Sequence, residues 1–209
     1  MTDNRFDTAA ADWDKKDGRV VLAGAIADRI ARLPLHEGMQ AMEYGCGTGL
    51  VGLALAPRLG SLVAADSSAG MLETLKAKIA GQGIATIFPR LLDLHQEDCG
   101  QDFDLIFSAM TLHHLADVHT ILKKFVHCLK PGGILVLADL DEEDGSFHQD
   151  NPEGVAHHGF NRLQLAGDLE KLGLSRVQSE TVHTIWKKAA AGGERPFTVF
   201  LLIAVKQPM

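Results

Sequence analysis

Met42-Glu43-Tyr44-Gly45-Cys46-Gly47-Thr48-Gly49 is the stretch that decides the fold, because an apolar run with an acidic residue leads directly into three glycines at alternate positions. Glycine has no Cβ, so it adopts conformations closed to other residues and lets a ligand reach the main chain. The stretch predicts a strand that turns into a helix, with the turn built for a bound small molecule. The same glycines also suit a tight turn without a ligand.

Acidic and small polar residues follow the neighbouring predicted strands. Asp66 comes after the second strand, Asp93 after the third and Ser108 after the fourth. In an open parallel sheet, ligands bind beyond the carboxyl ends of the strands where the strand order reverses. We therefore expect these residues to converge on the turn at Gly45 to Gly49 and to outline a nucleoside site.

Helical and strand patterns alternate along the chain, which is typical of an α/β fold with a mostly parallel, doubly wound sheet covered on both faces. The expected helices are 18–33, the turn to about 59, 68–79, 117–129 and 161–172, and the expected strands are 39–44, 61–65, 85–88, 103–107, 134–139, 175–185 and 198–206.

The expected organisation is one domain over residues 1–209, with a helical cap at 1–38, a cofactor-binding core at 39–139, and a substrate-side loop with terminal strands at 140–209. The segment 141–158 is too polar for the core and predicts a loop at the ligand-facing edge. The segment 187–196, rich in alanine and glycine, predicts a flexible connection in a short terminal hairpin.

Composition narrows the function. The chain has 209 residues, 46% of them hydrophobic, and a formal net charge of −7, which disfavours nucleic acid as the substrate. An N-terminal signal and a membrane-length apolar run are not seen, so we expect a cytoplasmic protein without a membrane partner. Cys46, Cys99 and Cys128 lack a Cys-x-x-Cys pair, so we predict buried fillers, with neither a disulfide framework nor a thiolate metal site.

Two cofactor classes compete for the predicted site. Gly47-Thr48-Gly49-Leu50-Val51-Gly52 fits Gly-x-Gly-x-x-Gly, and Asp66 lies 66 − 47 = 19 positions after Gly47, close to dinucleotide spacing. Read from the strand end at Gly45, however, the third glycine falls on Leu50. Glu43 also suits a ligand with an ammonium and a sulfonium better than a pyrophosphate. Charge therefore favours S-adenosylmethionine over a nicotinamide dinucleotide.

The ordered motifs resemble those of class I S-adenosylmethionine-dependent methyltransferases, in the small-molecule, type 11/12-like branch. The motifs are Glu43 to Gly49, Asp66-Ser67-Ser68-Ala69-Gly70-Met71-Leu72, Phe103 to Ser108, and Leu129-Lys130-Pro131-Gly132-Gly133. The resemblance covers about Met39 to Asp139, and beyond it nothing about the methyl acceptor is carried over. It implies a Rossmann-like, seven-stranded sheet with an antiparallel last strand.

The resemblance also implies site residues. Asp66 would accept from the ribose diol, for which two carboxylate oxygens are suited, although Asp66-Ser67-Ser68 is also a good helix cap. Asp93 and Leu94 would contact the adenine, Ser108 would lie near the methionine part, and Glu43 near its amino group. The full cofactor-binding set is Glu43, Gly45, Cys46, Gly47, Gly49, Asp66, Ser67, Met71, Asp93, Leu94 and Ser108.

Histidines near the expected acceptor side are the candidate catalytic groups. His113 and His114 follow the fourth strand, and either imidazole suits a general base, a substrate-lining role or plain packing. His148, His157 and His158 share a loop with four acidic residues, but their spacing follows no fixed ligand pattern, so we predict no metal. Trp13 either closes over the site or packs on the sheet edge.

The sequence thus predicts an S-adenosylmethionine-dependent methyltransferase that methylates a small molecule by in-line displacement, with S-adenosylhomocysteine as the product. Two alternatives stay open: a nicotinamide-dependent oxidoreductase, and a binding protein that keeps a nucleoside site without turnover.

Overall fold

The computed structural model describes residues 5–188 and 193–207, which form a seven-stranded sheet in the order β3-β2-β1-β4-β5-β7-β6. The first five strands in this order run parallel, and β7 is antiparallel to both β5 and β6. The expected fold class is confirmed. The strands are β1 (Gln40–Tyr44), β2 (Ser61–Asp66), β3 (Ile87–Leu91), β4 (Phe103–Ala109), β5 (Leu129–Leu140), β6 (Leu174–Lys188) and β7 (Glu194–Lys206).

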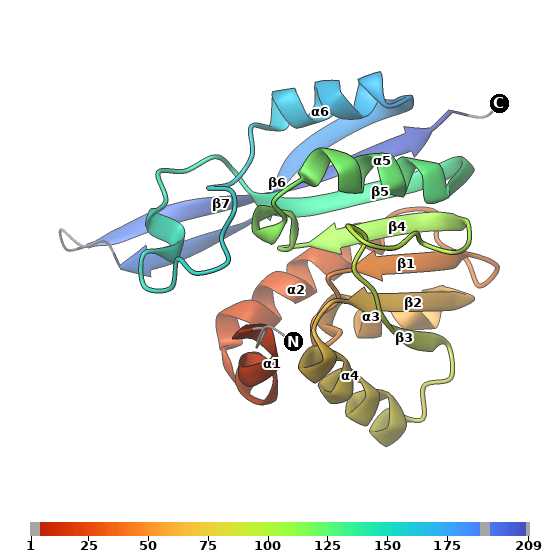
Figure 1. Cartoon of the computed structure of the whole chain (residues 1–209), viewed down its shortest axis with the longest axis horizontal. Coiled ribbons are helices and arrows are strands. Elements are labelled where there is room, and N and C mark those ends of the chain that lie inside the picture. The colour runs from red at the N-terminus through yellow and green to blue at the C-terminus, as the bar shows by residue number, and fades with distance from the viewer. Residues whose placement is uncertain (1–4, 189–192, 208–209) are drawn as a thin grey trace.

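Helices cover both faces of the sheet (Figure 1). One face carries α2 (Asp17–Ile30), α3 (Leu50–Leu55) and α4 (Ala69–Gln82), and the other carries α5 (Val118–Cys128) and α6 (Arg162–Lys171). Shorter elements are α1 (Arg5–Ala9) and the 3-10 turns η1 (Ala10–Lys15), η2 (Ala56–Arg58), η3 (Leu112–His114) and η4 (Ser146–His148). In Figure 1, α1 and the segment after β5 lie at the end of the sheet where the parallel strands finish.

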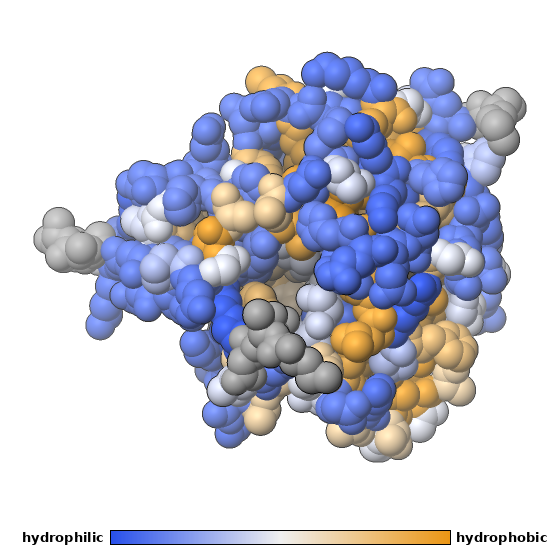
Figure 2. Space-filling view, viewed as in Figure 1, coloured by the Kyte–Doolittle hydropathy of each residue, from blue (hydrophilic) through white to orange (hydrophobic). Residues whose placement is uncertain are grey.

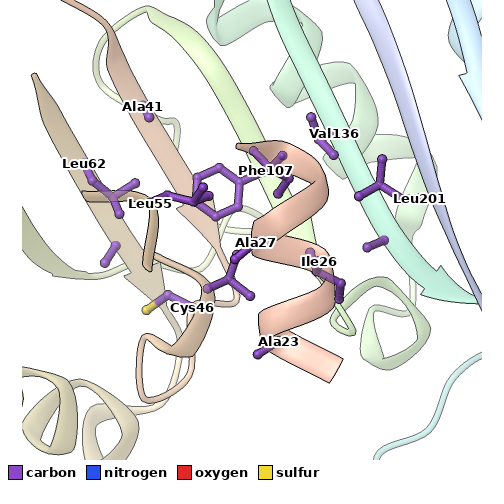
Figure 3. Close-up of a cluster of buried hydrophobic side chains, with 14 of the residues drawn as sticks. Ala23, Ile26, Ala27, Ala41, Cys46, Leu55, Leu62, Phe107, Val136 and Leu201 are labelled. Atoms are coloured by element: carbon purple, nitrogen blue, oxygen red, sulfur yellow. The ribbon is translucent and has the colours of Figure 1, made fainter. Parts of the chain in front are cut away.

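The helix α2 shows how the core is built. Leu22, Ile26 and Ile30 recur four residues apart and face the sheet, where Ile26 and Ala27 lie above Phe107 of β4 (Figure 3). Burying a Leu or Ile side chain stabilises the fold by roughly 1.5–3 kcal/mol. Val20 and Val21, which also fit the predicted helical pattern, lie on the exposed side instead.

Side chains fix the starts of several helices. The Ser68 hydroxyl accepts from the Met71 N–H at 3.2 Å, as the predicted cap requires, and the Asp117 carboxylate accepts from the Thr120 N–H at 3.0 Å. Each bond satisfies one of the N–H groups that a helix leaves free at its first turn. The points at which α4 and α5 begin are therefore fixed by residues close to them in the sequence.

Some element boundaries differ from the prediction. The terminal strands β6 and β7 pair as far as Lys188 with Glu194, so the two ends of segment 187–196 are strand and not linker, and residues 189–192 lie outside the described part of the chain. The strand β3 is 87–91 instead of 85–88.

The cysteine prediction was wrong in part. All three thiols are buried, as expected, but Cys99 and Cys128 form a disulfide, and only Cys46 is free. The two partners are 29 positions apart and meet because the segment before β4 packs against the last turn of α5. That proximity is tertiary and leaves no trace in cysteine spacing.

Within residues 5–188 and 193–207, none of the helices has the length and apolar character needed to cross a membrane. Hydrophilic residues cover most of the face seen in Figure 2, and hydrophobic ones gather where β3 and α4 lie.

Candidate nucleoside site

The glycine turn after β1 has the backbone that its sequence predicts. Gly45, Gly47 and Gly49 have φ of +73°, +53° and +82°, a region that favours glycine. A Cβ on Gly45 would lie 2.2 Å from Thr111 Oγ1, and one on Gly49 would lie 2.4 Å from Leu75 Cδ1, so packing requires both glycines.

Gly47 is different from its two neighbours. Among the described residues, a Cβ there would meet only Met71 Sδ, at 4.0 Å, so neighbouring atoms of the described chain do not require a glycine. The space beside the Gly47 Cα is therefore open within the described structure. An absent side chain beside open space is what the close approach of a ligand requires.

Asp66, at the end of β2, holds this turn. Its Oδ2 accepts from the Gly47 N–H at 2.7 Å and its Oδ1 from the Ser68 N–H at 2.8 Å. Burial raises the pKa of the Asp66 carboxyl, while these N–H groups and that of Ser67 act in the opposite direction. The carboxylate therefore lies at the turn, and its remaining lone pairs are the ones that a ribose diol would use.

Glu43 lies beneath the same turn. Its side chain is 2% exposed, and its Oε2 makes no well-formed hydrogen bond within the described residues. Burial, and then the charge of Asp66, raise the pKa of this carboxyl well above its usual value, and the Gly52 N–H acts in the opposite direction. A Cβ on Gly52 would lie 2.4 Å from this oxygen, so the glycine of α3 makes room for the carboxylate.

Ser108 and Asp93 reach the same edge of the sheet. The Ser108 hydroxyl donates to the Tyr44 carbonyl at 2.8 Å, behind the glycine turn. Asp93 follows β3, where its two oxygens accept from the His95 N–H and from the Gln96 side chain, both at 2.9 Å. Both residues therefore lie at the carboxyl ends of parallel strands, and their contact with a nucleoside stays a prediction.

Other predicted cofactor residues take different positions. The Leu94 side chain is completely buried in the core, so it does not line the open site, and its contact with an adenine ring stays a prediction. Cys46 points into the core as well (Figure 3), so only its main chain faces the turn. Met71 is buried beside Gly47, and Ser67 is exposed.

His113 and Asp139 form a buried pair near the carboxyl ends of β4 and β5. His113 is 1% exposed, and its Nδ1 lies 2.6 Å from an oxygen of Asp139, which has no exposed surface. Asp139 also accepts from the Leu140 N–H at 2.7 Å. The sequence placed Asp139 at the end of a strand but gave it no role; its position at the carboxyl edge was the available signal.

His114 and His148 complete a cluster with His113. The ring of His113 lies 4.0 Å from that of His114 and 5.0 Å from that of His148, measured between centroids. Burial, followed by the charge of His113, lowers the pKa of His114 to about 3 and that of His148 to about 4. His157 instead bonds to the Leu115 carbonyl, and His158 is exposed beside Glu143, so the loop histidines do not gather as one group.

The N-terminal segment lies over the glycine turn and the start of α4. Asp7 accepts from the Ser68 hydroxyl at 2.6 Å and from the Gly70 N–H at 2.8 Å, and Asp14 accepts from the Thr48 hydroxyl at 2.6 Å. Trp13 stacks on the Arg19 guanidinium at 3.5 Å and meets Phe6 edge-on. Sequence reasoning singled out Trp13 but not the two aspartates.

Comparisons with known proteins agree with this geometry. Residues 42–137 match the family described as "Methyltransferase domain". An uncharacterized methyltransferase of Schizosaccharomyces pombe is 32% identical over 136 residues, which are 58% of this chain and 48% of that protein. A ubiquinone biosynthesis O-methyltransferase of Sinorhizobium medicae is 26% identical over 155 residues, 66% of this chain and 62% of that protein. The chain therefore spans less than two thirds of either relative.

A solved structure shares the fold over nearly the whole chain. The DhpI–SAH complex superposes with a TM-score of 0.72 at 20% identity, and it covers 98% of this chain and 94% of its own. At this identity the likeness concerns the fold alone. The family match, the sheet order and the glycine turn together support a class I S-adenosylmethionine-dependent methyltransferase of the type 11 branch.

Proposed function

We propose that this protein transfers the methyl group of S-adenosylmethionine to a small-molecule acceptor. The observation that carries the proposal is the pair formed by Gly47 and Asp66. The glycine has an open main chain, and the carboxylate that holds it lies at 2.7 Å, where a ribose would be recognised.

Charge supports a cationic cofactor. Two carboxyl groups, Glu43 and Asp66, lie at the turn, and the Oε2 atom of Glu43 is buried without a well-formed hydrogen bond in the described structure. A ligand with an ammonium and a sulfonium favours the charged form of these groups, whereas a pyrophosphate repels it. The sheet order also departs from the order 3-2-1-4-5-6 of dinucleotide-binding folds, because β7 lies between β5 and β6.

Two observations support a small-molecule acceptor: the net charge of the chain and the name of a relative. A net charge of −7 is unfavourable for binding nucleic acid phosphates, and one matched relative carries the name of an enzyme of ubiquinone biosynthesis. We assign segment 1–38 to a cap over the cofactor, 39–139 to its binding, and 140–209 to the acceptor side. S-adenosylhomocysteine is the product.

Positioning supplies most of the rate in such a transfer, because the sulfonium is already a good leaving group. Holding both reactants in line contributes roughly 7–11 kcal/mol. His113 is fixed by Asp139 at the carboxyl end of β5. The catalytic or substrate-lining roles expected of His113 and His114 remain predictions.

Calorimetric titration with S-adenosylmethionine tests the cofactor half of the proposal. Asp66→Ala should weaken the affinity at least tenfold, about 1.4 kcal/mol, because the ribose loses its acceptor. Asp98→Ala, on the exposed segment before β4, is the control and should bind as the wild type does. Equal affinity of Asp66→Ala and wild type would remove Asp66 from the site.

A screen with a labelled methyl group tests turnover. Label should reach at least one small molecule from a panel of phenols, amines, carboxylic acids and thiols. Binding of the cofactor without transfer to any member of the panel would favour the non-catalytic protein.

A further inference from the structure

Three imidazoles from two distant segments, one after β4 and one after β5, lie close together. His113 and His114 belong to η3 and His148 to η4, and one ring nitrogen of each lies within 4.8 Å of those of the other two. Histidine is the commonest metal ligand in proteins.

Hydrogen bonds orient two of these rings. His113 Nδ1 donates to Asp139 at 2.6 Å, and His114 Nδ1 donates to the Gly154 carbonyl at 2.8 Å, since a carbonyl can only accept. The Nε2 atom of each ring then carries a lone pair. A carboxylate or carbonyl that fixes the tautomer of a ligating histidine in this way is the usual outer shell of a metal site.

His148 supplies the third lone pair. Its Nδ1 is buried and has no hydrogen-bond partner within the described residues. A buried polar atom without a partner costs about 1–3 kcal/mol, and a metal ion at this point would satisfy it.

The charges around the cluster have both signs. Asp139 faces His113, and Glu143 of the following loop has a buried Oε1 without a hydrogen-bond partner in the described chain. The positive charges of Arg5 and Lys187 act on His148 and disfavour a cation there. Arg5 Nη2 is 3.4 Å from His114 Nδ1, the nitrogen that faces Gly154, so it lies on the ring edge turned away from a metal held by Nε2.

We infer that His113, His114 and His148 form a binding site for a divalent transition metal, with zinc as the best match. Three histidines bind zinc at about 2.0–2.1 Å, which sets the nitrogens about 3.4 Å apart, so nitrogens that now lie within 4.8 Å of one another would approach by up to about 1.4 Å. The fourth position would take water or an acceptor oxygen. Binding of an acceptor oxygen by the ion rests on the proposed function, whereas the metal site itself does not.

Metal titration of the chelator-treated full chain tests the inference. The wild type should take up one equivalent of Zn²⁺, in competition with a chromophoric chelator, and Co²⁺ should give the strong visible bands of a tetrahedral site. His148→Ala should weaken Zn²⁺ binding by more than the roughly 10–100-fold that loss of an outer-shell partner costs. His158→Ala is the matched control on the same loop and should bind as the wild type does.

Absence of Zn²⁺ binding by the wild type, or equal losses in His148→Ala and His158→Ala, would overturn the inference. Circular dichroism and the S-adenosylmethionine titration of the same samples show whether each variant is folded, and His148→Gln replaces His148→Ala if that variant is not. Zinc binding without cofactor binding would remove the proposed function alone, and cofactor binding without zinc would remove the metal site alone.

Discussion

The two ends of the parallel strands are built in opposite ways. At the amino edge, polar and sulfur groups are joined to one another. Cys99 and Cys128 form the disulfide, the Lys206 ammonium donates to the carbonyls of Val126 and Leu129 at 2.7 Å and 2.5 Å, and Asp104 accepts from Lys130 at 2.9 Å.

At the carboxyl edge, several buried polar groups lack a hydrogen-bond partner within the described residues. They are Glu43 Oε2, Glu143 Oε1 and His148 Nδ1. Buried polar groups of this kind call for a partner. The amino edge therefore stabilises the sheet, while the carboxyl edge is left to a ligand.

The largest expected effect belongs to the amino edge. Replacing both cysteines of the disulfide (Cys99→Ser, Cys128→Ser) should lower the free energy of unfolding by about 3–4 kcal/mol, since the bridge closes a loop over a sequence separation of 29. Denaturant unfolding measures this loss. Cofactor affinity in the folded protein should stay within about twofold, and a tenfold loss would show that the two edges are not separate.

A pair of glycines tests the carboxyl edge. Gly47→Ala and Gly83→Ala both place a side chain at positive φ, +53° and +65°, where no atom of the described residues lies closer than 4 Å. Both should lose about 1 kcal/mol of stability. Only Gly47→Ala should lose cofactor affinity, by about 100-fold or about 2.7 kcal/mol, because the methyl group occupies the ligand's approach. Equal cofactor binding by the two variants in calorimetry would mean that no ligand contacts Gly47.

The third prediction concerns how the stability of Glu43→Gln, at the carboxyl edge, depends on pH. Because burial raises the pKa of Glu43 in the folded protein, the folded form holds this proton more tightly than the unfolded form does. The stability linked to it is full below the unfolded pKa of about 4.3 and falls as pH rises to the folded pKa. Thermal melts of the cofactor-free protein should therefore show Glu43→Gln gaining on the wild type as pH rises from about 4.5. A constant difference across pH would contradict the raised pKa.

The smallest loss of stability is expected for a partly exposed ion pair at the amino edge. Lys130→Met removes the contact with Asp104, in which the two side chains are 36% and 29% exposed. Solvent screening limits such a pair to about 0–1 kcal/mol. Chemical unfolding should show a loss in this range and calorimetry an unchanged cofactor affinity; a loss as large as that of the disulfide would be inconsistent with screening.

The sequence predicted what local patterns control. The glycine turn, the Ser68 cap and the strand ends at Asp66 and Ser108 depend on neighbours within a few positions, and the structure contains them. The alternation of elements predicted the mostly parallel sheet, whereas the antiparallel last strand was implied by the family resemblance.

Features that depend on distant segments were missed. The disulfide joins two positions 29 residues apart, and the cluster of His113 and His148 joins segments on either side of β5. Asp14 precedes α2 and Thr48 follows it by 18 positions (48 − 30), yet the Thr48 hydroxyl donates to the Asp14 carboxylate. Pairings of this kind are set by packing, which a single sequence does not reveal.

The identity of the cofactor is measured by mass spectrometry of nucleosides released from the purified protein after incubation with S-adenosylmethionine and a nicotinamide dinucleotide together. We expect one S-adenosylmethionine or S-adenosylhomocysteine per chain. Release of the nicotinamide dinucleotide instead, or of neither compound, would contradict the proposed cofactor.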